Sequence, residues 1–245
     1  MNLKPMENND PKINKIPDGN DSFLQDMKNW ICDSTTFAWQ YIWRPSTLGT
    51  PFVCSPFVAK EILKYVNYSG QEGPQLYLEA GSGTGAITRY FVEKKLRPQD
   101  ELHLVEINQT FCDVLKKKYA HLPNVFVHNE AVQDWSPSFP RKFDAIISTV
   151  PLNSLPSGEV LKNIFNSYLS FIKPEGTISS LEYVGISTLC KVCFFGEAKK
   201  QFKEITALKK SFFDQYSFEK SIVIRNIPPV SIDHCRVNTT MKKES

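Results

Sequence analysis

Long apolar runs are missing from the 245-residue sequence. A membrane-spanning helix needs about 18 or more consecutive apolar residues, and no stretch of this chain approaches that length. The first 21 residues are rich in Asn, Asp, Pro and Lys and lack the apolar segment of a secretory signal. We therefore predict that residues 1–21 form a disordered tail, and we expect a second short tail over residues 238–245.

Charge of one sign and cysteine are also scarce. The 29 Lys and Arg residues oppose 26 Asp and Glu residues, and a net charge of +3 is too small to indicate a nucleic-acid partner by itself. The six cysteines include a single C-x-x-C pair, Cys190 and Cys193. A zinc ribbon needs a second such pair, so we predict no metal site. Scattered cysteines of this kind are typical of reduced thiols in a cytosolic protein.

The sequence does contain the ordinary composition of a globular domain, with 41% apolar and 22% charged residues. From residue 55 onward, short apolar runs alternate with helical patterns. Ser55 and Pro56 have the pattern of a helix N-cap followed by proline at the first helical position. The predicted helices cover residues 57–68, 86–95, 109–119 and 161–172, and the predicted strands cover residues 75–80, 101–106, 125–128, 143–148, 176–183, 221–225 and 230–237.

This alternation indicates βαβ units. It predicts an α/β fold with one mostly parallel seven-stranded sheet and helices on both faces. The last two strands are separated only by a short connection that contains Pro228 and Pro229, which favours an antiparallel edge strand. Ligands of such sheets bind at the carboxyl ends of the strands, so we expect the site beside the first strand.

A glycine-rich loop follows that first strand and precedes a helix. Glycine is needed where the backbone turns tightly or approaches a ligand closely. Two acids follow the next two strands: Glu106 is placed to accept the hydroxyls of a ribose, and Glu130 is placed to meet an adenine amino group. The predicted cofactor-binding residues are Glu79, Gly81, Ser82, Gly83, Thr84, Gly85, Glu106, Ile107, Glu130 and Ala131.

Two ligands fit this loop. Read as G-x-G-x-x-A, residues 81–86 match a dinucleotide fingerprint, in which the helix N-terminus binds a pyrophosphate. The carboxylate of Glu79 would lie poorly beside that anion. S-adenosylmethionine carries a sulfonium and an ammonium instead, so the acid favours this cofactor. A turn that binds no ligand is the third interpretation.

The order of these motifs resembles that of class I S-adenosylmethionine-dependent methyltransferases over residues 55–237. Three stretches are similar to the bacterial soluble phospholipid N-methyltransferases, which are themselves related to ribosomal RNA adenine dimethylases: residues 44–56, 148–152 and 224–229. The resemblance implies a Rossmann-like fold, S-adenosylmethionine as cofactor and S-adenosylhomocysteine as product. It also implies a phosphatidylethanolamine headgroup, or its partly methylated forms, as methyl acceptor, and a cytoplasmic protein that is peripheral to the inner face of the membrane.

The loop after the fourth strand departs from the adenine dimethylases. Those enzymes carry N-[LI]-P-[YF], in which an amide accepts from the adenine amine and an aromatic ring stacks on the base. Here residues 149–152 are Thr-Val-Pro-Leu. The change disfavours a planar base and suits an aliphatic amine. RNA adenine N6-methylation, another small-molecule or protein amine, and cofactor binding without catalysis stay open as alternatives.

Acceptor chemistry is predicted at the ends of the fourth and fifth strands. An alkyl ammonium must lose a proton before it can attack, and Tyr183 is the candidate to orient or deprotonate it. Ser148 is a candidate to hold the amine, and His128 is a second candidate base. Each of the three also has a purely structural interpretation. The predicted substrate-binding residues are Tyr41, Arg44, Pro151 and Arg225, with the two arginines suited to a headgroup phosphate.

An aromatic segment precedes the domain. Three of the four tryptophans, Trp30, Trp39 and Trp43, fall within residues 22–54. Tryptophan and tyrosine favour the bilayer interface, so we predict a helical segment that acts as a lid over the pocket and as a reversible membrane contact. The alternative is that this apolar face packs on the domain.

Overall fold

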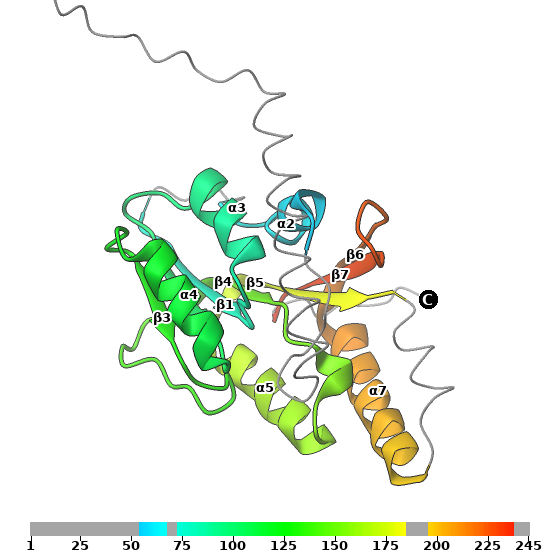
Figure 1. Cartoon of the computed structure of the whole chain (residues 1–245). Helices are drawn as coiled ribbons and strands as arrows, with labels where there is room; N and C mark the ends of the chain where they lie inside the picture. Colours follow the sequence, from blue (N-terminus) through cyan, green and yellow to red (C-terminus); the bar gives the residue numbers. More distant parts are fainter. Residues whose placement is uncertain (1–53, 68–72, 185–195, 238–245) are drawn as a thin grey trace, which may run out of the picture.

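The computed structural model describes residues 54–67, 73–184 and 196–237 (Figure 1). The predicted tails, most of the aromatic segment, Tyr41, Arg44 and the Cys190–Cys193 pair lie outside these described residues. Within them, none of the helices is both long and apolar enough to cross a bilayer.

Seven strands form one sheet in the order β3-β2-β1-β4-β5-β7-β6. Strands β1 to β5 pair in parallel, whereas β7 pairs antiparallel with both β5 and β6. This arrangement confirms the predicted α/β fold with a mostly parallel sheet. The strands are β1 (Leu76–Ala80), β2 (Glu101–Val105), β3 (Val125–His128), β4 (Phe143–Ser148), β5 (Ile172–Tyr183), β6 (Ser217–Val223) and β7 (Val230–Cys235).

Helices cover both faces of the sheet (Figure 1). One apolar cluster joins the sheet to α2 (Pro56–Ile62), α3 (Ala86–Lys94) and α4 (Gln109–Tyr119). A second cluster, on the opposite face, joins it to α5 (Gly158–Phe171) and α7 (Gly196–Tyr216). A short 3-10 helix, η1 (Leu152–Ser154), follows β4. Burial on both faces explains why β1 is an apolar run without alternation.

Local signals set several helix ends. The side chain of Asn108 accepts from the amide of Phe111 at 3.3 Å and caps α4, and Ser157 caps α5 through the amide of Val160 at 3.2 Å. At its other end α5 stops at Phe171, because Pro174 disfavours helical backbone in the residue before it.

Several predicted boundaries differ from the structure, and strand β5 for example begins at Ile172, not at residue 176. Helix α2 ends at Ile62, not at residue 68, and the chain turns through Asn67, whose φ is +58°. Strand β6 covers Ser217–Val223, not residues 221–225, because it continues directly from α7. The predicted antiparallel edge is confirmed: β7 lies between β5 and β6, and the edge strand β6 pairs antiparallel with it.

Strand β1 occupies the centre of the parallel part, with β2 on one side and β4 on the other. The chain leaves β1 toward β2 and returns to β4 on the far side, which makes β1 and β4 the topological switch point. A crevice at the carboxyl ends of these strands is the expected ligand position.

Candidate cofactor and acceptor site

The glycine loop turns at the carboxyl end of β1 with three residues in the left-handed region. Gly81, Gly83 and Gly85 have φ values of +77°, +54° and +87°. A methyl group on Gly81 would lie 3.1 Å from the amide nitrogen of Val150, in the loop after β4. Glycine is therefore required here by backbone conformation and by the close approach of two loops.

Glu106 is held in place by backbone amides. Its Oε2 accepts from the amide of Gly83 at 2.8 Å, and its Oε1 accepts from the amide of Asn108 at 2.8 Å. Burial raises the pKa of Glu106 above its ordinary value, while these backbone hydrogen bonds oppose the shift. The carboxyl group is thus fixed beside the glycine loop with acceptor capacity left for a ligand hydroxyl.

Glu79 is fully buried in β1. Its Oε1 accepts from the hydroxyl of Thr88 at 3.0 Å, and its Oε2 has no hydrogen-bond partner among the described residues. Burial raises the pKa of Glu79 to about 8, and the nearby charge of Glu106 contributes to the increase. A buried carboxyl oxygen without a partner fits a cationic ligand far better than a pyrophosphate.

A cavity of about 310 Å³ opens at the carboxyl ends of the strands. Of the predicted cofactor residues, Gly81, Gly83, Glu106, Ile107, Glu130 and Ala131 line it, and Pro151 lines it from the loop after β4. The other four predicted residues do not line it: Glu79 is fully buried in β1, Ser82 is buried and donates to the Glu79 carbonyl at 3.2 Å, Thr84 lies within the loop, and Gly85 caps α3.

Ile107 is 69% exposed and stands at the edge of this cavity. A large apolar side chain of this kind, next to an acid that is predicted to accept ribose hydroxyls, suits the face of an adenine ring. The remaining lining residues are mainly apolar: Val105, Phe111, Val132, Gln133, Thr149, Val150, Leu155, Pro156, Val160 and Ile164.

A smaller hollow adjoins the loop after β4. Thr149, Pro151 and Tyr183 line it, together with Leu152, Asn153, Ser154, Leu181 and Glu182. The Tyr183 hydroxyl lies 3.9 Å from the Cys54 sulfur, and the ring is 8% exposed. Because Thr149 and Pro151 line both hollows, the hollow that Tyr183 lines adjoins the cofactor cavity.

Ser148 and His128 have structural partners instead. Ser148 is fully buried, and its hydroxyl lies 2.8 Å from that of Tyr168. The Nε2 of His128 lies 3.0 Å from the Nδ1 of His103, which is within hydrogen-bond range, and the two rings stack. Burial lowers the pKa of His128. Neither residue lines the cavity, whereas Thr149, which follows Ser148, does.

The predicted headgroup arginine lies on the β6–β7 connection. The guanidinium of Arg225 stacks 5.0 Å from the ring centroid of Phe57, and the residue is exposed. The backbone beside it is anchored to the start of α2, since Asn226 Oδ1 accepts from the Ser55 amide at 2.8 Å. Ser55 also donates through its hydroxyl to the Arg225 carbonyl at 2.8 Å.

The sequence did not reveal a polar network beside the hollow that Tyr183 lines. Lys209 is only 6% exposed, and its Nζ lies 2.6 Å from Glu182 Oε1 and 2.5 Å from Asn153 Oδ1. In the sequence Lys209 is part of a lysine pair that reads as a solvated helix face. Only the packing of α7 against η1 reveals that one lysine of the pair points inward.

Comparisons with known proteins bear on the kind of domain and on its fold. Residues 78–176 match the family model of the methyltransferase domain. No significant sequence match to a curated protein was found. The N-methyltransferase NodS from Bradyrhizobium japonicum, solved with S-adenosylhomocysteine, has a similar fold, with a TM-score of 0.54 and 15% identity over 74% of this chain and 87% of that one. A precorrin-6y C5,15-methyltransferase from Geobacter metallireducens gives a TM-score of 0.51 and 15% identity over 75% and 89%.

These two structures establish the fold. The matched region, residues 78–176, has the Rossmann-like fold of class I S-adenosylmethionine-dependent methyltransferases. Its cofactor is S-adenosylmethionine, which agrees with the buried, unpartnered oxygen of Glu79 and argues against the dinucleotide alternative.

Proposed function

We propose that this domain methylates the amine of a phospholipid headgroup, in phosphatidylethanolamine or its partly methylated forms. The observation that carries the proposal is an apolar tip on the β6–β7 hairpin. Ile222, Ile224 and Ile227 are 64%, 76% and 76% exposed. Three exposed isoleucines, one at the end of β6 and two on the connection to β7, are unusual for a surface that faces only water.

The position of this tip relates it to the acceptor side. Val230, the first residue of β7, pairs with Tyr183 at the end of β5 and with Val223 at the end of β6. The tip therefore projects from the same edge of the sheet at which the strands open toward the cofactor cavity. Val184, which follows Tyr183, is 44% exposed and extends the apolar surface. A lipid headgroup that enters beside Tyr183 would come from a bilayer in contact with this surface.

The loop after β4 supports an aliphatic amine as acceptor. Thr149 donates its hydroxyl to the Gly81 carbonyl at 2.6 Å, so it braces the glycine loop. Pro151 and Leu152 present neither an amide nor an aromatic ring to a flat base. An aliphatic amine requires neither group, because it needs a passage of suitable width and a means of losing its proton.

S-adenosylmethionine supplies a methyl group on a sulfonium: the amine nitrogen gains the methyl, the electron pair of the broken C–S bond stays on sulfur, and the amine proton passes to a base or to water. With a reference pKa of about 10.4, only on the order of one alkyl amine in a thousand is neutral at pH 7. We infer that Tyr183 orients this amine and accepts its proton or passes it to water. Glu106 and the glycine loop hold the other reactant, and most of the rate enhancement comes from positioning the two.

The test is a transfer assay with methyl-labelled S-adenosylmethionine and the full chain. Separate reactions contain phosphatidylethanolamine vesicles, total RNA, a protein mixture, and small primary amines. Label in the extracted lipid is expected, with much less in a parallel reaction that uses Glu106→Ala at the same cofactor concentration. Label that enters only RNA, protein or free amines would reject the phospholipid acceptor and leave the methyltransferase assignment intact.

A further inference from the structure

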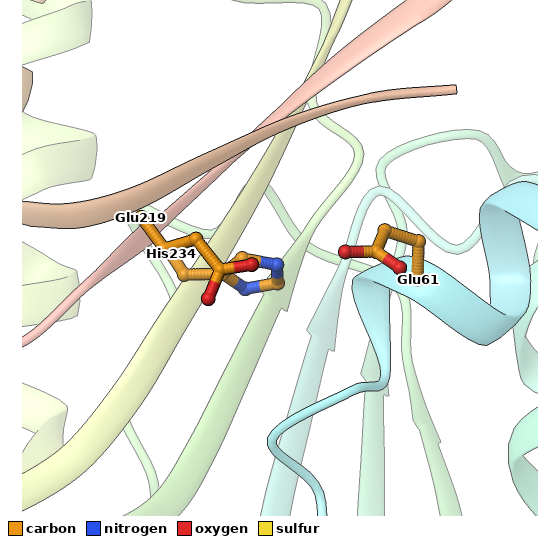
Figure 2. Close-up of side chains that lie close together, drawn as sticks. All are labelled: Glu61, Glu219 and His234. Carbon is orange, nitrogen blue, oxygen red and sulfur yellow. The ribbon is translucent and has the colours of Figure 1, made fainter. Parts of the chain in front are cut away.

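Two carboxylates and an imidazole meet beside the C-terminal strands. Glu61 comes from α2, Glu219 from β6 and His234 from β7 (Figure 2). One potential ligand atom from each of the three lies within 4.8 Å of the other two. Figure 2 shows the Glu61 side chain facing the Glu219 and His234 side chains across a gap between α2 and the sheet. Among the described residues, none of the three lines the cofactor cavity.

His234 is prepared to act as a ligand. It is fully buried, and its Nδ1 lies 2.8 Å from the Ser179 hydroxyl. Its Nε2 is also buried and has no hydrogen-bond partner among the described residues. When Nδ1 carries the proton and donates it to the Ser179 hydroxyl, Nε2 has a lone pair that accepts no hydrogen bond and is available to a metal ion. Metal-binding histidines are typically oriented in this way, by a hydrogen bond from the nitrogen that does not bind the metal.

The cluster already holds a cation. The Lys64 ammonium contacts Glu219 Oε1 and lies 3.8 Å from Glu61 Oε1. The Lys64 side chain is 40% exposed, so it can turn into solvent without leaving a cavity. The Arg236 guanidinium is held separately, over the rings of Tyr65 and Phe218 at 5.7 Å and 4.6 Å. The cation that pairs with the two carboxylates is therefore the partly exposed Lys64.

We propose that Glu61, Glu219 and His234 bind a divalent transition-metal ion of the Zn²⁺ class, which replaces the Lys64 ammonium. Two carboxylate oxygens and an imidazole nitrogen, completed by water, form a typical ligand set for such ions. Ligand atoms about 2.1 Å from a tetrahedral zinc lie about 3.4 Å apart, so the side chains must close by on the order of 1 Å. Glu61 and Glu219 are partly exposed, which allows this movement.

The bound ion would connect α2 to the β6–β7 pair. The same two parts of the chain already meet through Ser55 and Asn226, at the other end of the hairpin. Ser221 contributes to the connection, because its hydroxyl contacts Glu61 Oε1 at 2.7 Å and Glu219 Oε1 at 3.2 Å. The expected consequence is higher stability of this edge of the sheet. A role in methyl transfer is not expected, since the cofactor cavity is lined by other residues.

The test is titration of the chelator-treated full chain with ZnCl₂ and CoCl₂, followed by calorimetry, thermal unfolding and cobalt absorption. One saturable site and a rise in Tm are expected. Glu61→Gln is expected to weaken binding by at least about tenfold, and Ser179→Ala, which frees the His234 ring, by about tenfold. Lys64→Met is expected to tighten binding because the competing ammonium is removed. The matched control is Lys60→Met, because Lys60 is an exposed lysine of α2 outside the cluster, and this variant should bind the metal with unchanged affinity.

Two results would overturn the proposal. The first is the absence of saturable binding in both the unmodified chain and Lys64→Met, a variant that keeps all three ligands. The second is evidence that the ion binds elsewhere. Affinity that Glu61→Gln leaves unchanged would be such evidence, and a cobalt spectrum with thiolate bands would assign the ion to cysteines. The increase in affinity on removal of a lysine is the distinguishing result, since a cysteine site elsewhere would not respond to it.

Discussion

The amide of Gly83 donates a 2.8 Å hydrogen bond to Oε2 of Glu106 and so connects the glycine loop after β1 to the end of β2. The other oxygen of Glu106 is fixed by the amide of Asn108, just before α4. The carboxyl group is therefore oriented before any ligand arrives. Preorganisation of this kind lowers the conformational cost of binding, because neither the loop nor the acid has to be ordered by the cofactor.

Glu106→Ala should weaken binding of S-adenosylmethionine strongly. The change removes the predicted acceptor for the ribose hydroxyls and releases the glycine loop. Hydrogen bonds to charged groups contribute about 1.5–3 kcal/mol each, so a loss of about 10- to 100-fold in affinity is expected by calorimetry. Glu101→Gln is the control, because Glu101 lies at the other end of β2 and pairs with Arg141 at 2.7 Å on the surface. Equal affinities for the two variants would remove Glu106 from the cofactor site.

Gly81→Ala should disturb both the glycine loop and the loop after β4. Its φ of +77° is unfavourable for alanine, and the added methyl would lie 3.1 Å from the Val150 amide nitrogen. We expect the free energy of unfolding to fall by about 1–3 kcal/mol, together with cofactor affinity. Gly73→Ala is the matched control, since a methyl there would meet nothing within 4 Å. Chemical denaturation of both variants makes the comparison, and similar losses would contradict it.

The parts of the molecule that the sequence predicted well depend on local signals. The strand, glycine loop and helix around Gly81 are contiguous, and Glu106 is placed by the end of an apolar run. The errors have physical causes too. Helix α2 ends early because residues after Ile62 turn back toward the sheet, and β6 begins early because α7 continues directly into it.

Long-range packing decided what the sequence could not predict. The sequence did not reveal that the Ser148 hydroxyl lies beside that of Tyr168, or that the His128 ring lies beside that of His103. Lys209 reads as a solvated lysine and is buried against Glu182. The cluster of Glu61, Glu219 and His234 joins residues that are distant in sequence, so no spacing pattern could indicate it, and the expectation of no metal site considered only cysteine spacing.

Glu79 should make the stability of the cofactor-free protein depend on pH. Its pKa is about 8 in the folded state and near 4.5 when the chain is unfolded. The folded protein therefore binds this proton more tightly, and the resulting stabilisation is fully present below pH 4.5 and is lost as the pH rises through 8. Glu79→Gln should be less sensitive, with a difference on the order of 2 kcal/mol in the change between pH 6 and pH 8.5.

The measurement is chemical denaturation of both proteins at the two pH values. The histidines with lowered pKa values are common to both, so the difference isolates Glu79. Cofactor binding gives a second test. A cation beside Glu79 favours the ionised carboxylate, so binding at pH 7 should release up to about one proton, as seen by calorimetry in buffers of different ionisation enthalpy. The same pH response in Glu79→Gln would show that the carboxyl group does not titrate in this range.

The isoleucines of the β6–β7 tip provide the sharpest test of the lipid acceptor. Burial of an isoleucine contributes about 1.5–3 kcal/mol, so the double variant Ile224→Ser, Ile227→Ser should bind phosphatidylethanolamine vesicles at least about tenfold more weakly. Methyl transfer to vesicles should fall in parallel, while cofactor affinity and transfer to a micelle-free, short-chain lipid should not change. Val114→Ser is the control, because Val114 is 43% exposed on α4, away from the hairpin. If vesicle binding and transfer survive in the double variant, the tip is not the membrane contact, and the remaining support for a lipid acceptor is the loop after β4 alone.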